Sequence, residues 1–343
     1  MLQYLYIPAF FLVLLSSGLS YAAGYLEKGN DHYRNGAFKK AINAYRMAIS
    51  AGENRALALF NMANASYQSE DLAAAAANYE LSVADAPDFA RCWRNLGIMY
   101  YELGDCGAAV AALERVLDLE GDSSVTVLLV LASAHKDLEH YGVAATFLER
   151  AVERDSTVDE AFLMLYEIAR RTGDRSEALG WLGRYPVNGR RYYDVLLLTG
   201  ELQLEQGDTA AALATFRGST RIDARRGSGW FKLVNLLYRM DAAFTALEEA
   251  RTAVASVERP ENLCLLAGRI AFEGGYYRRA EDFYERCIRS GHPDGFIGMN
   301  NLHAVYERLG DTGGKQRIQQ LTDTVNRESG NGTYDEKNQQ HRR

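Results

Sequence analysis

Histidines and cysteines are the side chains of this sequence that could form a catalytic or metal site. His135 and His140 lie five residues apart, with Asp137 and Glu139 between them. Side chains share a helix face at intervals of three or four, so this spacing does not align two metal ligands. The sequence also lacks a phosphate-binding glycine loop, a nucleophile elbow and a metal-binding cysteine pair. We therefore interpret the two histidines as part of a solvated turn, and expect no enzyme activity, metal or cofactor.

The four cysteines allow one disulfide at most. Cys92 lies near the start of one expected helix and Cys106 just past the turn that follows it, and a rise of about 1.5 Å per residue keeps them well over about 10 Å apart. Cys264 and Cys287 fall on two expected antiparallel helices and could meet. We favour two small buried apolar residues over a disulfide, because Cys287 occupies a position that alanine fills in other parts of the sequence.

A periodic pattern of small residues predicts the elements that carry these side chains. One series lies at intervals of 34 or 35: Ala41, Ala75, Ala109, Ala144, Ala178, Ala212, Ala246 and Ala280. A second series contains Gly29, Ala63, Gly97, Ala132, Gly200 and Gly268, and is interrupted by Tyr166 and Val234. Two helices approach closely only where a side chain is small, so each pair of positions predicts one helical hairpin.

The segment from Trp93 to Leu119 contains the clearest hairpin, two amphipathic stretches joined at a Gly-Asp break. Its Trp93, Leu96, Gly97 and Tyr100 resemble the signature of the tetratricopeptide repeat, a helical hairpin of about 34 residues. The resemblance implies an all-α, right-handed superhelix of about nine hairpins. Its function would lie in variable surface residues, because the signature residues serve packing.

The hairpin register divides the chain into a segment 1–22, a solenoid 23–328 and a disordered tail 329–343. The expected hairpins are 22–55, 56–89, 90–124, 125–158, 159–192, 193–226, 227–260, 261–295 and a polar capping hairpin 296–328. The strongest interior turn cluster runs from Tyr185 to Arg191. It predicts an ordinary loop between repeats or a bend in the array.

The resemblance also supplies candidate binding residues. In this family the first helix of each hairpin lines the concave face, and one subset binds a C-terminal carboxylate through lysine, asparagine and basic residues. Asn30, Asn61 and Arg91 match that pattern, whereas Leu26 and Asn95 replace two of its basic residues. Losing the lysine removes a charge-assisted hydrogen bond to the carboxylate, so we favour another peptide or protein surface as the ligand. The expected polar contacts are Asn30, Asn61, Arg91, Arg94 and Asn95.

Composition narrows the class of partner. The net charge is −7 and the calculated pI is 5.5. The net charge is −9 in residues 1–180 and +2 in residues 181–343. Neither half of the chain therefore has the basic character expected of a nucleic-acid-binding protein. We expect a protein or peptide partner and no nucleic acid.

The N-terminal segment predicts export. Ile7 to Leu15 is apolar, and small residues follow at Ser20 and Ala22, which suits a secretory signal cleaved after Ala22. The alternative is a retained anchor in the inner membrane. We therefore expect a periplasmic protein, or an anchored one that faces the periplasm.

These observations predict a non-enzymatic scaffold that binds a peptide or partner protein along its concave surface. The alternative is a structural accessory subunit of a membrane or envelope complex, docking through its convex face or its N-terminal anchor. The sequence identifies no partner.

Overall fold

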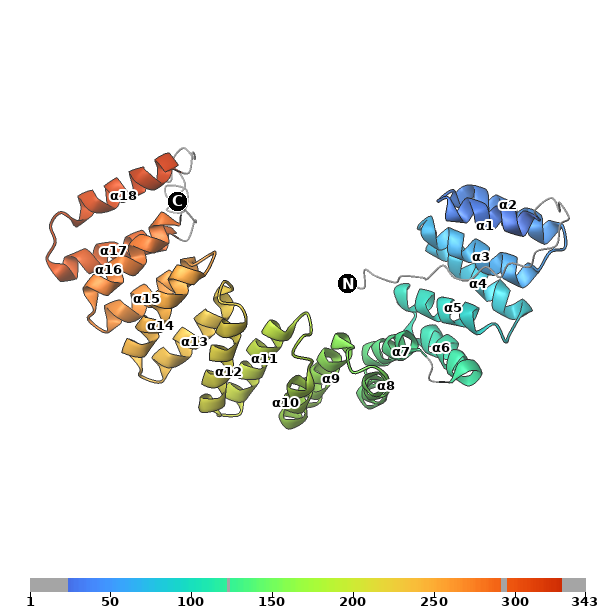
Figure 1. Cartoon of the computed structure of the whole chain (residues 1–343), viewed down its shortest axis with the longest axis horizontal. Coiled ribbons are helices and arrows are strands. Elements are labelled where there is room, and N and C mark those ends of the chain that lie inside the picture. Colours follow the sequence, from blue (N-terminus) through green and yellow to red (C-terminus); the bar gives the residue numbers. More distant parts are fainter. Residues whose placement is uncertain (1–23, 122–123, 291–294, 329–343) are drawn as a thin grey trace. The chain divides into compact units, whose positions relative to one another are not determined.

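The computed structural model describes residues 24–121, 124–290 and 295–328. These ranges contain eighteen α-helices in nine consecutive hairpins and no strand (Figure 1). The prediction of an all-α fold of about nine hairpins is confirmed. The predicted export segment 1–22 and the predicted tail 329–343 lie outside the described residues. Among the described helices, none combines the length and the apolar character needed to cross a membrane.

The chain divides into two compact units, Met1–Arg150 and Ala151–Arg343, which we describe separately. The first unit contains seven complete helices, and an eighth, α8 (Tyr141–Arg154), continues across the division. The seven are α1 (Tyr25–Arg34), α2 (Phe38–Ser50), α3 (Arg55–Gln68), α4 (Leu72–Asp85), α5 (Ala90–Glu102), α6 (Cys106–Glu120) and α7 (Val125–Asp137).

The second unit contains the remaining hairpins. Its helices are α9 (Asp159–Thr172), α10 (Arg175–Arg184), α11 (Tyr192–Glu205), α12 (Thr209–Ile222), α13 (Gly227–Arg239), α14 (Ala243–Ser256), α15 (Glu261–Glu273), α16 (Tyr277–Arg289), α17 (Gly295–Leu309) and α18 (Gly314–Glu328). Within this unit α11, α13 and α15 follow the inner edge of a curved stack, and α12, α14 and α16 follow its outer edge (Figure 1).

The Gly-Asp breaks form the turns inside the hairpins. Gly104 has a φ of 84° and Gly207 a φ of 84°, a left-handed conformation that glycine adopts without steric cost. The aspartate after each glycine then caps the second helix. Asp105 accepts a hydrogen bond of 2.9 Å from the amide of Ala108, and Asp208 accepts one of 2.9 Å from Ala211. The dipeptide therefore ends one helix and begins the next.

The two series of small residues occupy the contact between the helices of each hairpin. All eight alanines of the first series are fully buried. Each glycine of the second series lies against a large side chain of the second helix. Gly97 lies under Leu113, where an added Cβ would come within 2.5 Å of a Leu113 side-chain carbon, and Gly200 lies under the ring of Phe216. The small residue of the first helix is thus matched by a large residue of the second.

The two interruptions of the second series have different physical solutions. Val234 lies opposite the register position of Ala250, and both are buried in one hydrophobic cluster, so the large and small residues have exchanged helices. Tyr166 on the first helix lies opposite the register position of Leu182 on the second, and both are buried. The Tyr166 hydroxyl accepts a hydrogen bond of 3.2 Å from Arg170. The ring is therefore accommodated by placing its polar end at the surface of α9.

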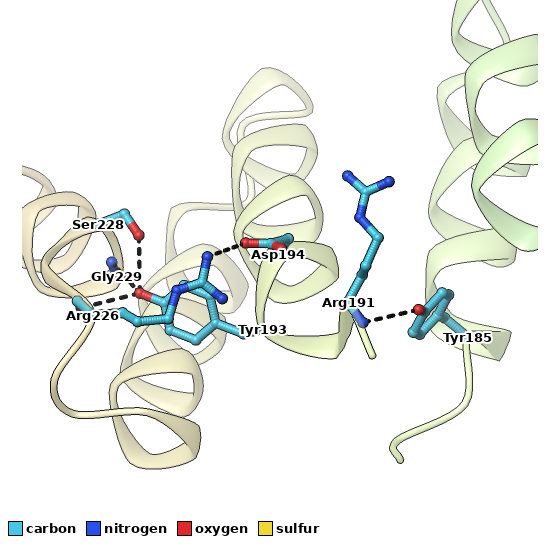
Figure 2. Close-up of polar contacts among 7 residues, drawn as sticks. All are labelled: Tyr185, Arg191, Tyr193, Asp194, Arg226, Ser228 and Gly229. Carbon is cyan, nitrogen blue, oxygen red and sulfur yellow. Dashed lines mark hydrogen bonds and ion pairs between the residues drawn. The ribbon is translucent and has the colours of Figure 1, made fainter. Parts of the chain in front are cut away.

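The turn cluster from Tyr185 to Arg191 is an ordered loop between repeats. The amide of Arg190 donates to the carboxylate of Asp159 at 2.9 Å, and the amide of Arg191 donates to the hydroxyl of Tyr185 at 3.2 Å (Figure 2). The division between the two compact units falls in α8 instead.

All four cysteines are free thiols in the structure. Cys264 and Cys287 are both buried, which fits the interpretation as small core residues. Burial raises the pKa of the Cys264 thiol to about 12, and the neighbouring Cys287 adds to the shift. The Cys264 thiol is therefore protonated at neutral pH.

Exchanging large and small residues in the sixth hairpin tests the packing rule. Gly200→Val should lower the free energy of unfolding by about 1–3 kcal/mol because it overpacks the contact with Phe216. Phe216→Ala should lower it by about 3–5 kcal/mol because it leaves a cavity. The double variant reproduces the arrangement of Val234 and Ala250. Urea unfolding should therefore show that its free energy of unfolding falls by less than the sum of the two single-variant losses, with a difference of about 1 kcal/mol or more. Strict additivity would contradict the rule.

Candidate functional site

The predicted asparagines lie on the first helices of the first three hairpins, and two of them, Asn30 and Asn61, bond to each other. The side-chain amide of Asn61 donates to the Asn30 side-chain oxygen at 3.0 Å. The hydroxyl of Tyr45 donates to the same oxygen at 2.9 Å. Asn30 and Asn61 are half-buried. The structure therefore brings them together as a bridge between two consecutive hairpins.

The same triad recurs one repeat later. Asn95 donates to the side-chain oxygen of Asn64 at 3.1 Å and to the hydroxyl of Tyr79 at 3.2 Å, and Tyr79 donates to Asn64 at 2.5 Å. Each member is 34 residues from its counterpart. The sequence analysis did not identify Asn64, although its interval of 34 from Asn30 was a visible signal.

The two predicted arginines have separate environments. Arg91 is exposed, and its guanidinium carbon lies 5.8 Å from the ring centroid of Phe60. Arg94 forms an ion pair with Glu120, and its buried Nε has no hydrogen-bond partner. Neither arginine hydrogen-bonds to Asn30, Asn61 or Asn95 within the described ranges. The assignment of these five residues as partner contacts stays a prediction.

Tyrosines also connect the first helices of neighbouring hairpins. The Tyr67 hydroxyl donates to Glu102 at 3.1 Å, and the Tyr101 hydroxyl donates to Asp137 at 3.0 Å. Burial, together with the hydrogen bond to the carboxylate of Asp137 and its charge, raises the pKa of Tyr101 to about 12. In the first unit, many polar groups on this face are therefore engaged by bonds between repeats.

The second unit has a cavity of about 920 Å³ along its first helices. Its lining comes from three consecutive hairpins, through α13, α15 and α17 and the loop before α15. The inner edge of the stack in Figure 1 carries α13 and α15, so the cavity lies on the concave side of this unit. A volume of this size is in the range of known ligand sites.

The cavity combines exposed apolar side chains with basic ones. Phe231 is 37% exposed and Ile297 is 52% exposed, and the partly buried Leu265 also lines the cavity. Arg259 and Arg269 also line the cavity, and Lys232 is paired with Glu201. Large exposed apolar residues beside charged ones are typical of surfaces that bind another molecule.

A network around Tyr193 fixes the start of α13, which carries Phe231 (Figure 2). The buried Tyr193 hydroxyl accepts a hydrogen bond of 2.7 Å from the amide of Gly229 and lies 3.0 Å from the hydroxyl of Ser228. The Arg226 guanidinium stacks over the Tyr193 ring at 3.9 Å and bonds to Asp194 at 2.6 Å. These contacts hold the start of α13, and with it one wall of the cavity, in position. The apolar side chain of Phe231 takes no part in the network.

The sequence analysis did not identify this cavity. The signal was available, because Phe231 and Leu265 occupy the same repeat position as Arg94. The same positions in the later hairpins carry apolar residues that remain partly exposed.

The predicted solvated turn at His135 and His140 is wrong for one of the two residues. His135 is only 8% exposed, and its ring stacks on Phe147 with centroids 5.6 Å apart. The two Nδ1 atoms lie 3.4 Å apart, because the turn at Glu139 reverses the chain with a φ of 61°. Within the described residues, no group of three potential ligand side chains forms a metal site.

Comparison with known proteins agrees with the helical hairpins. The tetratricopeptide repeat family model matches residues 26–88, 62–124 and 94–159, and a second model of this repeat matches residues 194–218. The matched residues of this chain are tetratricopeptide repeats. The resemblance seen at Trp93, Leu96, Gly97 and Tyr100 is thus confirmed. Tetratricopeptide repeats are protein–protein interaction scaffolds, and this chain has that architecture.

Individual relatives match at low identity. The RNA polymerase II-associated protein 3 of Xenopus laevis is 27% identical over 97 residues, and the match spans 28% of this chain and only 15% of that protein. The crystal structure of MamA is 17% identical, with a TM-score of 0.43, and covers 47% of this chain and 93% of that one. A tetratricopeptide repeat protein from Parabacteroides merdae is 14% identical, with a TM-score of 0.45, and covers 79% and 98%.

The buried histidine predicts a loss of stability in acid. Burial lowers the pKa of His135 below its ordinary value of 6.5, the positive charge of His140 lowers it further, and Glu114 opposes the shift. A lowered pKa in the folded state means that the unfolded chain binds more protons, so stability is complete above pH 6.5 and falls below it. His135→Leu should reduce the change in melting temperature between about pH 7.5 and about pH 5.5.

His32→Gln is the matched control for this measurement, because His32 lies on the half-exposed face of α1. It should retain the pH dependence of the unaltered chain. An unchanged pH dependence in His135→Leu would contradict the role of His135.

Proposed function

We propose that this protein is a non-enzymatic scaffold that holds a segment of a partner protein in the concave cavity of its second unit. The observation that carries the proposal is the cavity of about 920 Å³, lined by three consecutive hairpins, with Phe231 and Ile297 exposed in it. These exposed apolar side chains are available to a ligand. This is the architecture expected of a groove that binds a protein segment.

The rigidity of the cavity supports this function. Burying one of these apolar side chains under a ligand contributes about 1.5–3 kcal/mol before the cost of ordering is subtracted. Tyr193 holds the start of α13 through Gly229 and Ser228, so little of this wall must be ordered on binding. Because a preformed wall loses little conformational entropy on binding, more of the free energy of burial contributes to affinity than with a flexible wall.

A second candidate function is docking through an exposed cluster at the turns before α14 and α16 and the start of α14. Phe244 is 56% exposed, Tyr276 is 41% exposed and Met240 is 44% exposed. The Arg279 guanidinium lies 4.9 Å from the Phe244 ring centroid and 5.8 Å from that of Tyr276, and it is paired with Glu248 at 2.9 Å. This aromatic cluster would suit an accessory subunit that docks by its outer surface.

Selection of random peptides displayed on phage, with the full chain as bait, tests the cavity. Peptides enriched on the unaltered chain should bind Phe231→Ser at least about tenfold more weakly, because one buried apolar contact is lost. Phe244→Ser is the matched control, since it removes an exposed phenylalanine from α14. It should leave peptide affinity unchanged.

Circular dichroism should show the same melting temperature for both variants within the error of the measurement. Failure to enrich any peptide, or equal binding to the unaltered chain and Phe231→Ser, would contradict the cavity proposal. Loss of binding in Phe244→Ser alone would favour the outer surface.

A further inference from the structure

A side-chain bridge joins the first helices of several neighbouring hairpins. The bridging pairs are Asn30 with Asn61, Asn64 with Asn95, and Glu201 with Lys232. In each pair the two residues are 31 apart, and the first directly follows the small residue that packs against the second helix of its hairpin. The bridge therefore uses one fixed pair of positions, whether its chemistry is amide to amide or charge to charge.

The bridge is absent between the three hairpins that form the cavity. Its two positions carry Asn235 and Leu266 between the seventh and eighth hairpins, and Arg269 and Asn300 between the eighth and ninth. Leu266 has no polar side-chain atom, and among the described residues neither pair is joined by a hydrogen bond or an ion pair. The face that bonds between repeats elsewhere is therefore open at the cavity.

The open bridge leaves Arg269 as an exposed cation. Arg269 belongs to α15 and lines the cavity, as does Leu265 four residues before it. Within the described ranges its guanidinium makes no ion pair and no hydrogen bond. The cavity residue Lys232 is instead paired with Glu201, and Arg259 already interacts with another group of the protein. The charge of Arg269 is therefore available to a ligand.

The nearest carboxylates of α15 do not neutralise Arg269. Glu273 lies one turn later, and its carboxylate accepts a hydrogen bond from the hydroxyl of Tyr238. Glu261, which lines the cavity, lies eight residues earlier, about 12 Å along the helix axis. The lining residues carry three basic side chains and one acidic one, so the cavity is basic although the whole chain has a net charge of −7.

A ligand that packs on the apolar side chains of the cavity also covers Arg269. Residues four apart share one face of a helix, so Leu265 and Arg269 lie about 6 Å apart along one face of α15. Removing a guanidinium from water without an acceptor costs free energy, because its donors lose their hydrogen bonds to water. A ligand that buries this face must therefore place an anionic acceptor at Arg269.

We propose that the cavity binds a protein segment that carries an Asp or Glu beside apolar residues. The carboxylate pairs with Arg269, and the apolar residues pack on Phe231, Leu265 and Ile297. A guanidinium and a carboxylate can form two parallel hydrogen bonds, so the acidic residue fixes the position of the segment in the cavity. The proposal rests on the proposed function of the cavity and specifies the chemistry of its partner.

Peptides selected on phage with the unaltered chain provide the probes. The strongest binder is synthesised with a fluorescent label, together with versions in which its acidic residues are replaced by the matching amides or by lysine. Fluorescence anisotropy with the full chain should show an affinity at least about tenfold lower for the amide version, because a charge-assisted hydrogen bond is lost. The lysine version should bind more weakly still. Selection of peptides without an acidic residue would contradict the proposal.

Substitution of Arg269 locates the contact. Arg269→Gln should weaken binding of the acidic peptide at least about tenfold. Arg269→Glu should reverse the preference, so that the lysine version binds more tightly than the acidic one. Arg251→Glu is the matched control, since it makes the same change of charge at an exposed position on α14. It should bind all three peptides like the unaltered chain, and circular dichroism should show that every variant is folded.

The outcomes separate this proposal from the function on which it rests. If the selected peptides lose affinity for Phe231→Ser but bind Arg269→Gln as tightly as the unaltered chain, the acidic partner is wrong and the cavity function stands. If no peptide is enriched, or none depends on Phe231, both fail. Equal weakening by Arg269→Glu and Arg251→Glu, or displacement of the peptide by single-stranded DNA, would overturn the proposal by showing a general attraction of anions.

Discussion

The contact between a small residue of the first helix and a large residue of the second fixes the geometry of each hairpin. Gly97 under Leu113 and Gly200 under Phe216 allow the two helices to approach until side chains interdigitate. Val234 and Ala250 exchange the two sizes and are still both buried. Because this contact recurs every 34 or 35 residues, each first helix presents the same register positions to the same face of its unit.

The side chains at these repeated positions serve two purposes within one chain. In the first unit, inner-face groups bond across neighbouring hairpins, as Asn61 does to Asn30 and Tyr67 does to Glu102. In the second unit, Phe231 and Ile297 remain exposed around a cavity, and the Tyr193 network supports the wall from behind. The same helical scaffold thus strengthens stacking in one unit and offers a binding surface in the other.

The hairpin fold could be predicted from the sequence because its determinants are local and periodic, as the fully buried Ala41 and Ala280 illustrate. The chemistry of the inner face could not, because asparagine at a groove position is compatible with either a ligand or another asparagine. Only coordinates show that the amide of Asn61 meets Asn30. The burial of His135 could not be predicted either, because it comes from the stack with Phe147, twelve residues later in the sequence.

The most direct test of the account is site-specific photocrosslinking in the native cell. A photoreactive phenylalanine analogue at Phe231 samples the concave cavity, and the same analogue at Phe244 samples the face of the second helices. The account predicts a covalent adduct with a partner protein from position 231 and none from position 244. An adduct from position 244 alone would contradict it, and would assign recognition to the outer surface.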